Sequence, residues 1–489
     1  MDLFSLTIHE AVKGLAAKKF SSVDITKSCI DRAKKLNSKL NAYTYFAEKS
    51  ALDEARKADE VLAKGKPKSH LTGIPVALKD VFCTAGIPTT ACSNILRNFV
   101  PPYDATVVKK LRNAGMVLVG KTNTDEFTCG ASTETSCFGV TKNPWDAERV
   151  AGGSSGGSAA AVGADCCIYA LGTDTGGSIR QPSAYCGITG LKVTYGRVSR
   201  FGVISMASSL DTIGPMAKDV VDCAIVLNEI AGRDAQDSTT PDVQVPDYTL
   251  NLNAKDLKGL KIGLPKEYFI PGMDGEVEAK VRDAVNHFEK LGATVREISL
   301  PHTKYSIAVY YIICPSEVSA NMARYDGIRF GPGPSGEGEN LHEYYLQARS
   351  EGFGDEMKRR IMIGTYALSS GYYDAYYLKA QRVRTLVKKD FDDAFADVDV
   401  IITPTTAGTA FKVGENSSDP VKMYLEDVFT CSINIAGLPA LALPCGFSSL
   451  KLPIGMQIIG KQFDEAQLLR VGELYQRTTD WHKMKPANL

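Results

Sequence analysis

The chain has 489 residues, 44% of them hydrophobic and 23% charged, and its 56 Lys and Arg residues equal its 56 Asp and Glu residues in number. This composition is typical of a globular protein and excludes a disordered chain, which would have fewer apolar residues and more net charge. A net charge of zero argues against a polybasic nucleic-acid binder. If the chain serves RNA biology, another component must therefore hold most of the phosphates.

The cysteines and the N-terminus indicate the cellular compartment. Twelve cysteines are scattered along the chain, with no C-x-x-C and no Cys/His cluster of zinc-ligand spacing, so we expect buried, reduced thiols and no metal site. The first residues lack the basic and apolar regions of a secretory signal. No uncharged apolar run approaches the ~20 residues of a membrane span. These features predict a cytoplasmic protein with no membrane partner.

The first half of the chain alternates helical and strand patterns. About 65 residues of helix come first, with segments 22–36 and 47–63 as the clearest, before Gly65 and Pro67 interrupt the pattern. An apolar strand over 74–78 then ends at Lys79. A helix over 106–114 and a short apolar strand over 116–119 follow. Residues 151–202 hold 12 of the 43 glycines, and strand and helix patterns resume over 210–230.

The second half returns to alternation after a polar stretch over about 232–256, which predicts a surface excursion. Its predicted elements are strands at 261–264, 293–300, 398–402, 440–443 and 455–459, and helices at 277–291, 344–369, 372–395 and 465–477. No repeat is visible, so the pattern predicts a layered α/β fold. We expect one domain over 1–489: a helical layer (about 1–65), a core (about 70–230), the excursion, and a C-terminal α/β part (about 257–489).

Two short motifs match known active sites but lack their structural context. Gly115 to Thr122 fits the phosphate-loop pattern G-x-x-x-x-G-K-[ST], yet its middle residues are Met-Val-Leu-Val, which predict a buried strand rather than a phosphate cradle. Gly152 to Gly156 fits the G-x-S-x-G elbow, yet a polar loop precedes it and no histidine lies nearby. Neither motif alone predicts the chemistry.

The glycine-rich region as a whole is better explained as one active site than as two separate motifs. Gly-Gly-Ser occurs at 152–154 and 156–158 and then again at 176–178, after an apolar segment that a flexible linker would not contain. Glycines let backbone N–H groups approach a reacting carbonyl and hold its oxyanion. With no histidine at hand, Lys79 is the natural base, although it needs its pKa lowered by about three units, or ~4 kcal/mol. The residues alone therefore favour a Ser/Lys amide or ester hydrolase.

The region from Gly152 to Ser158 and on to Gly176–Pro182 resembles the signature of the amidase signature family, and residues 73–80 resemble the family's lysine motif. This resemblance implies a large mixed β-sheet covered by helices on both faces. It also implies a Ser–Ser–Lys triad: Ser178 as nucleophile, Ser154 on a cis peptide as proton relay, and Lys79 as base. Backbone N–H groups around Thr175, Gly176 and Gly177 would form the oxyanion hole.

Later motifs, including 195–202, 350–354 and 367–377, are similar to those of the family's glutaminase subunits of tRNA-dependent amidotransferases. That resemblance implies that Arg359 binds the α-carboxylate of L-glutamine and Asp427 its α-amino group, with Tyr310 nearby. The chemistry agrees, because guanidinium grips carboxylate through a fork and carboxylate pairs with ammonium. Arg360 is the alternative carboxylate ligand, one position along.

The same resemblance implies partners and no cofactor in this chain. The family's B and C subunits would complete a heterotrimer. The first would use ATP and Mg to activate glutamyl-tRNA(Gln), or aspartyl-tRNA(Asn) in some organisms, and would bind most of the tRNA. The second would brace the pair. Two other functions stay open from the sequence: a stand-alone amidase for small or fatty amides, and a nucleotide binder that uses Lys121.

Overall fold

The computed structural model describes residues 2–336, 340–417 and 419–487. Within these residues, 11 strands form a single sheet in the order β1-β3-β2-β4-β6-β5-β10-β11-β9-β7-β8. Along the sheet they are β1 (Tyr43–Phe46), β3 (Val117–Thr122), β2 (Pro75–Lys79), β4 (Tyr169–Asp174), β6 (Thr212–Ala217), β5 (Thr189–Lys192), β10 (Ala440–Phe447), β11 (Pro453–Ile459), β9 (Val400–Pro404), β7 (Lys261–Pro265) and β8 (Thr294–Ile298).

The sheet is mixed and joins the two halves of the chain. Strand β2 is parallel to β3 and β4, and β7 is parallel to β8 and β9, whereas the strands between these two groups pair antiparallel. The halves meet where β5 pairs with β10, Ala440 facing Lys192. Every residue of β2, β3, β4, β6 and β11 is buried, so both sheet faces are covered, as a helix-covered mixed sheet requires.

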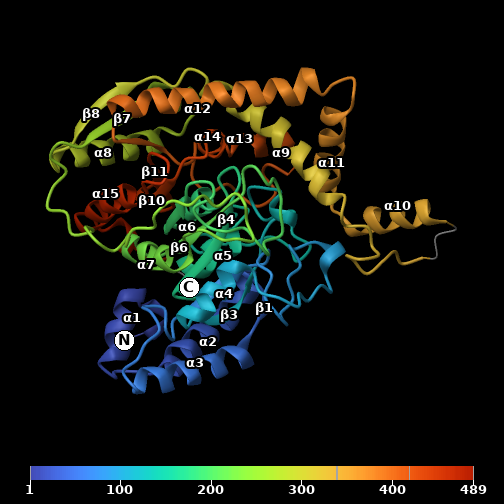
Figure 1. The fold of residues 1–489 in the computed structure, drawn as a ribbon. Helices are drawn as coiled ribbons and strands as arrows, with labels where there is room; N and C mark the ends of the chain where they lie inside the picture. Colours follow the sequence, from blue (N-terminus) through green and yellow to red (C-terminus); the bar gives the residue numbers. More distant parts are fainter. Residues whose placement is uncertain (1, 337–339, 418, 488–489) are drawn as a thin grey trace.

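Helices form the covering layers, and Figure 1 shows the N-terminal ones (blue) at one end of the molecule and α9, α11 and α12 (yellow and orange) at the other. The N-terminal helices are α1 (Ile8–Ala16), α2 (Ser22–Leu40) and α3 (Glu48–Ala63). The middle of the chain adds α4 (Thr106–Ala114), α5 (Gly156–Gly163), α6 (Arg180–Cys186), α7 (Val220–Ile230) and α8 (Gly275–Lys290). The last third adds α9 (Ser306–Met322), α10 (Leu341–Gly352), α11 (Asp355–Leu368), α12 (Lys379–Asp397), α13 (Pro420–Leu425), α14 (Cys431–Ala436) and α15 (Glu465–Arg477).

Most predicted elements are present, some with the same bounds. The helix at 106–114 is α4 and the one at 465–477 is α15, and residues 232–256 contain turns and isolated bridges but no helix or strand. The helix expected over 344–369 is instead two, α10 and α11, because the chain is extended at Phe353 and Gly354. Across the described ranges, no helix is both long and apolar enough to cross a membrane.

Helix α9 is the main element that the sequence did not predict. It contains Pro315 in its interior, which normally argues against a helix, and it has no clear polar face because ten of its residues are buried. It packs most extensively against α11. A Cβ atom on Gly364 of α11 would lie 1.9 Å from the Pro315 carbonyl oxygen, so glycine permits this close approach. These two helices carry three residues that the sequence assigned to substrate binding or its alternative: Tyr310, Arg359 and Arg360.

Candidate active site

Lys79 is the last residue of β2, and its side chain is fully buried. Its Nζ donates hydrogen bonds to three hydroxyl oxygens: Ser154 Oγ at 2.7 Å, Ser155 Oγ at 2.9 Å and Thr173 Oγ1 at 2.8 Å. The strand thus places the amine at the centre of a ring of hydroxyl groups. The structure thereby brings together two of the three residues of the predicted triad.

The environment of this amine favours its neutral form. Burial lowers the pKa of Lys79 to about 7, even though the carboxylates of Asp125, Asp174 and Asp211 act in the opposite direction. A substantial fraction is therefore unprotonated at neutral pH and can accept a proton. The fold supplies the lowering of the pKa that a lysine base requires.

Ser154 follows a cis peptide bond between Gly153 and Ser154. Gly153 fits a crowded position, because a Cβ there would lie 2.2 Å from Asp125 Oδ2 and 2.4 Å from the Ser132 nitrogen. Helix α5 begins two residues later at Gly156. The Ser155 N–H donates to the carbonyl oxygen of Ser178 at 3.1 Å, and this bond ties the glycine-rich run at 152–158 to the one at 176–178.

A buried ion pair holds the turn that carries Ser178. Arg180 Nε and Nη2 donate to the two carboxylate oxygens of Asp174, each at 3.0 Å, and both side chains are fully buried. Burial alone would raise the pKa of Asp174, but Arg180 lowers it to about 2. Arg180 also donates to Gln457 and Asn434 of the C-terminal half. The ends of the turn 174–180 are therefore fixed to both halves of the sheet.

Between these ends, the predicted oxyanion residues lie in close contact with the C-terminal half. A Cβ on Gly176 would lie 2.6 Å from Tyr310 Cζ, and one on Gly177 would lie 2.3 Å from Thr430 Oγ1. Gly177 also has φ of +154°, which side chains rarely adopt. Thr175 Oγ1 donates to Asp211 Oδ1 at 2.7 Å, which fixes the Thr175 side chain.

Asp427 lies on the other side of this turn. A Cβ on Gly177 would lie 3.3 Å from Asp427 Oδ1, and Tyr311 donates to Asp427 Oδ2 at 3.1 Å. Burial raises the pKa of Asp427 to about 7, against the opposing effects of Arg360 and Tyr311. A bound ammonium group would restore the ionised form, so the position fits the expected amino-group ligand.

The two adjacent arginines of α11 differ sharply in position. Arg360 is buried, with its guanidinium 5.3 Å from the centre of the Tyr311 ring and 5.4 Å from that of Tyr424, and its Nε donates to Glu356 at 2.8 Å. Arg359 pairs with the same Glu356, but its side chain is 41% exposed at the rim of a pocket. Both arginines line this pocket and pair with Glu356, but the Arg360 side chain is buried whereas that of Arg359 is partly exposed.

That pocket lies between α11, α13 and the segment 130–135. Its wall includes Gly130 and Ser132, and the latter's backbone nitrogen packs against Gly153. The opposite wall includes Glu356, Tyr424 and both arginines, Arg359 and Arg360. A small molecule held by Arg359 in this pocket would therefore lie next to the segment that carries Ser154.

Several residues that complete the site were not predicted from the sequence. Ser155 and Thr173 bind the Lys79 amine as closely as Ser154 does, and Tyr311 holds Asp427. Ser155 directly follows Ser154 in the glycine-rich run, so its position in the sequence was a usable signal. No signal was available for Tyr311, since its helix was not predicted.

The nucleotide-binding hypothesis for Lys121 is wrong. Residues 117–122 form strand β3, and the Lys121 side chain is fully buried beneath it. Its Nζ donates to the carbonyl oxygen of Phe82 at 2.7 Å and to Thr89 Oγ1 at 2.8 Å. The motif therefore offers neither a phosphate-binding turn nor an accessible lysine.

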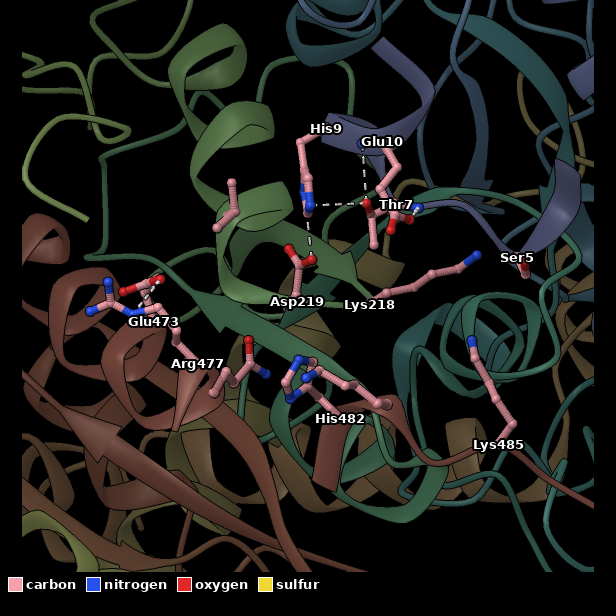
Figure 2. Close-up of a pocket in the computed structure, with 13 residues that line it drawn as sticks. Ser5, Thr7, His9, Glu10, Lys218, Asp219, Glu473, Arg477, His482 and Lys485 are labelled. Carbon is pink, nitrogen blue, oxygen red and sulfur yellow. Dashed lines mark hydrogen bonds and ion pairs between the residues drawn. The ribbon is translucent and has the colours of Figure 1, made fainter. Parts of the chain in front are cut away.

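A second pocket lies where α1 meets the start of α7 and the C-terminal segment (Figure 2). His9 Nδ1 is 3.2 Å from Asp222 Oδ1 and 3.6 Å from Asp219 Oδ2. Asp222 also accepts from the Ile8 N–H at 2.7 Å, and the Asp219 side chain caps α7. These contacts of His9, Asp219 and Asp222 hold α1 against α7, so the three residues have a structural role.

A buried lysine against a serine, with a second serine in a glycine-rich turn, is the arrangement of an amide-hydrolysing serine enzyme. The comparisons with known proteins agree: the Amidase family model matches residues 24–469. The chain belongs to the amidase family.

Relatives with full-length similarity show which members of the amidase family this chain resembles. The A subunit of glutamyl-tRNA(Gln) amidotransferase from Carboxydothermus hydrogenoformans is 55% identical over 99% of this chain and 100% of its own. The protein of that name from Thermodesulfovibrio yellowstonii is also 55% identical, with the same coverage. The crystal structure of its Thermotoga maritima counterpart is 40% identical, with a TM-score of 0.82 over 99% of this chain and 98% of that one. A bacterial aryl acylamidase has a TM-score of 0.86 at 25% identity, over 98% and 97% of the two chains.

Proposed function

We propose that this chain is the glutamine-hydrolysing subunit of a tRNA-dependent amidotransferase. The observation that carries the proposal is the 2.7 Å contact between the Lys79 amine, with its pKa lowered to about 7, and Ser154. A lysine in this state can draw a proton through Ser154 from a neighbouring hydroxyl. The full-length relatives that carry the name glutamyl-tRNA(Gln) amidotransferase support the choice of substrate.

The first half-reaction transfers the glutamyl group to Ser178. Ser178 Oγ attacks the side-chain carbonyl carbon of glutamine, its proton passes to Ser154, and the Ser154 proton passes to Lys79 Nζ. Backbone N–H groups of the turn at Thr175, Gly176 and Gly177 stabilise the oxyanion, an effect of roughly 3–4 kcal/mol per donor in comparable sites. As the intermediate collapses, the C–N bond breaks and the departing nitrogen takes the proton back from Lys79 through Ser154 as ammonia forms.

The second half-reaction frees the enzyme. A water molecule gives its proton along the same relay and its oxygen attacks the glutamyl ester on Ser178. The ester bond breaks, Ser178 regains a proton, and glutamate leaves. The same lysine therefore acts as base and then acid in both steps.

The substrate's zwitterionic end fits the residues on the C-terminal side. Arg359, exposed at the pocket rim, would bind the α-carboxylate, and Asp427 would bind the α-ammonium group. Tyr310, packed on Gly176, would set the depth at which the side-chain amide stops. Buried Arg360 would hold this wall in place through Glu356.

The proposal includes partners that this chain alone does not supply. An ATP-using partner, the B subunit, would activate the glutamyl-tRNA with ATP and Mg and would accept the ammonia. A bracing partner, the C subunit, would hold the pair together in the cytoplasm. The equal count of 56 basic and 56 acidic residues suits a chain that leaves most tRNA contacts to the ATP-using partner.

The test measures amidation by the purified complex with two nitrogen donors. Ser178→Ala should abolish formation of glutaminyl-tRNA(Gln) with glutamine, by at least ~10³-fold. It should leave formation with free ammonium unchanged, because the ATP-using partner performs that step. Ser183→Ala is the matched control, since the Ser183 hydroxyl donates to the Ile179 carbonyl oxygen one turn earlier, at the start of α6.

Two results would contradict the proposal. Full glutamine-dependent activity in Ser178→Ala would exclude the assigned nucleophile. Rapid hydrolysis of simple amides by the isolated chain, with no binding to either partner, would instead identify a stand-alone amidase.

A further inference from the structure

The turn that carries Ser178 presents a row of unused hydrogen-bond donors. Its residues are buried, and the backbone N–H groups of Thr175, Gly176 and Gly177 donate no hydrogen bond within the part of the chain that the structure describes. Buried N–H groups in folded proteins are nearly always paired, so three consecutive donors without acceptors indicate an acceptor from outside the chain. The proposed reaction supplies one, the oxyanion that forms on the side chain of glutamine.

The carbonyl groups of the same turn, by contrast, are held by side chains. The Asp174 carbonyl oxygen accepts hydrogen bonds from Thr212 Oγ1 at 2.8 Å and from Asn434 Nδ2 at 3.2 Å. The Gly176 carbonyl oxygen accepts one from Thr430 Oγ1 at 2.5 Å. Neighbouring elements therefore hold the turn by its carbonyl groups and leave its N–H groups open.

The contact with the Gly176 carbonyl fixes the direction of an oxyanion donor. In a trans peptide unit, the C=O of one residue and the N–H of the next lie in one plane and point in opposite directions. The Gly176 carbonyl and the Gly177 N–H belong to one such unit, and its orientation depends on torsion angles of two glycines, which no Cβ restricts. A hydroxyl that holds the Gly176 oxygen therefore also sets where the Gly177 N–H points.

Thr430 is itself fixed by the protein around it. Its side chain is fully buried, its carbonyl oxygen accepts from Arg180 Nη2 at 3.1 Å, and its N–H donates to the Asp427 carbonyl oxygen at 3.1 Å. Its Oγ1 lies 3.2 Å from that Asp427 oxygen as well, but a hydroxyl has one proton, and the shorter contact of 2.5 Å assigns this proton to Gly176. The segment that carries the proposed ammonium ligand thus also supplies the hydroxyl that holds the turn.

We propose that Thr430 is a positioning residue of the oxyanion hole: its hydroxyl binds the Gly176 carbonyl oxygen and thereby aims the Gly177 N–H at the reacting carbonyl of glutamine. The inference rests on the proposed function, since it is that reaction which forms the oxyanion. In this role Thr430 acts through one peptide unit and exchanges no proton with the substrate. Because the oxyanion is absent from bound glutamine, the hydroxyl raises kcat without strengthening the binding of the substrate.

The test compares three single variants of this chain in the purified complex. Thr430→Val keeps the shape of the side chain and removes the hydroxyl, whereas Thr430→Ser keeps the hydroxyl. Thr240→Val is the matched control, because the buried Thr240 hydroxyl also donates to a backbone carbonyl oxygen, that of Asp237 at 2.7 Å, in the surface excursion. Glutaminase kinetics and thermal unfolding are measured for each variant. Amidation of glutamyl-tRNA(Gln) with free ammonium shows that each complex is intact.

We expect Thr430→Val to lower kcat and kcat/KM for glutamine by the same factor, ~10- to 100-fold, because it loses an interaction made only in the transition state. Its KM and its ammonium-dependent activity should equal those of the parent. Thr430→Ser should have a kcat close to that of the parent, and Thr240→Val should match the parent in kcat and KM. A hydroxyl that only supports the fold would not produce this separation of kcat from KM.

Three kinetic results would overturn the inference: an unchanged kcat in Thr430→Val, a higher KM with an unchanged kcat, or an equal loss of kcat in Thr430→Ser. A Thr430→Val chain that fails to fold would overturn it as well, because the hydroxyl would then support the fold rather than the reaction.

The outcomes also separate this inference from the proposed function. If the parent complex releases no ammonia from glutamine, the proposed function fails. If the parent is active and Thr430→Val keeps its kcat, the function stands and only the role of Thr430 is wrong.

Discussion

The pKa of Lys79 sets the pH range in which the proposed triad can work. Burial lowers it to about 7, and only the neutral amine can accept the proton that passes through Ser154. Asp427 has its pKa raised to about 7 by burial and must be ionised to bind an ammonium group. Both groups are deprotonated in their active forms, so both favour a pH above 7.

We therefore predict that kcat/KM for glutamine falls as the pH drops below about 7, because Lys79 becomes protonated and Asp427 neutral. The profile of kcat should keep the Lys79 contribution alone, since bound substrate holds Asp427 ionised. Steady-state glutaminase kinetics of the complex across pH test this. In Asp427→Asn the acid limb of kcat/KM should become shallower; an unchanged limb would exclude Asp427.

Substituting the two adjacent arginines of α11 should have different effects: one variant should weaken glutamine binding and the other should lower the stability of the fold. Arg359→Ala should raise KM for glutamine roughly 30- to 100-fold, the loss of a charge-assisted fork, with little change in Tm because its side chain is largely outside the core. Arg360→Ala should lower the free energy of unfolding by about 3 kcal/mol, because it removes a buried side chain that packs on the Tyr311 and Tyr424 rings and pairs with Glu356.

Kinetics and thermal unfolding of both variants provide the check. The reverse pattern would be a high KM with normal stability in Arg360→Ala and no kinetic change in Arg359→Ala. That result would show that Arg360, not Arg359, binds the α-carboxylate of glutamine. The sequence alone could not decide between adjacent arginines, because two successive residues of one helix point about 100° apart and the helix orientation was unknown.

At the scale of elements, the contact of α9 with α11 positions the wall that we propose binds glutamine. Gly364 lies against the Pro315 backbone, where an added Cβ would be 1.9 Å from the carbonyl oxygen. Because a backbone atom cannot swing aside, a larger residue must move α11 and with it Arg359. The wall therefore depends on a residue that touches no substrate.

Gly364→Ala should lower the free energy of unfolding by about 1–3 kcal/mol and raise KM for glutamine several-fold. Gly371→Ala is the matched control, because nothing lies within 4 Å of an added Cβ there. Thermal unfolding and glutaminase kinetics measure both effects. A Gly364→Ala enzyme with the KM and Tm of the control would show that α11 is not positioned by this contact.

The elements also show what the sequence could and could not predict. The sequence predicts strand β2 with Lys79 because a short apolar run is typical of a buried strand. It predicts a catalytic role for the glycine-rich runs at 152–158 and 176–178 because consecutive glycines let backbone N–H groups approach a reacting carbonyl. Helix α9 was missed because its interior Pro315 and its apolar faces hide the helical period. Tyr310 was therefore placed by resemblance alone.

At the scale of the molecule, the sheet joins the half that carries the proposed triad to the half that carries the proposed glutamine-binding residues. Lys79, Ser154 and Ser178 come from the part before β5, whereas Tyr310, Arg359 and Asp427 come from the part that follows. Their meeting depends on Arg180, which joins Asp174 to Gln457 and Asn434. Alternating elements predicted the layered sheet, but this crossing contact depends on tertiary packing.

The central claim is that Ser178 carries the glutamyl group during catalysis. The most direct measurement is mass spectrometry of the complex, quenched in acid within its first turnovers of glutamine and then digested. We predict a mass gain of one glutamyl group that fragmentation of the peptide places on Ser178, absent in Ser178→Ala; fragmentation is needed because no Lys or Arg separates Ser154 and Ser155 from Ser178. A glutamyl adduct on Ser154 or Ser155 instead, or ammonia release that continues in Ser178→Ala, would contradict this assignment.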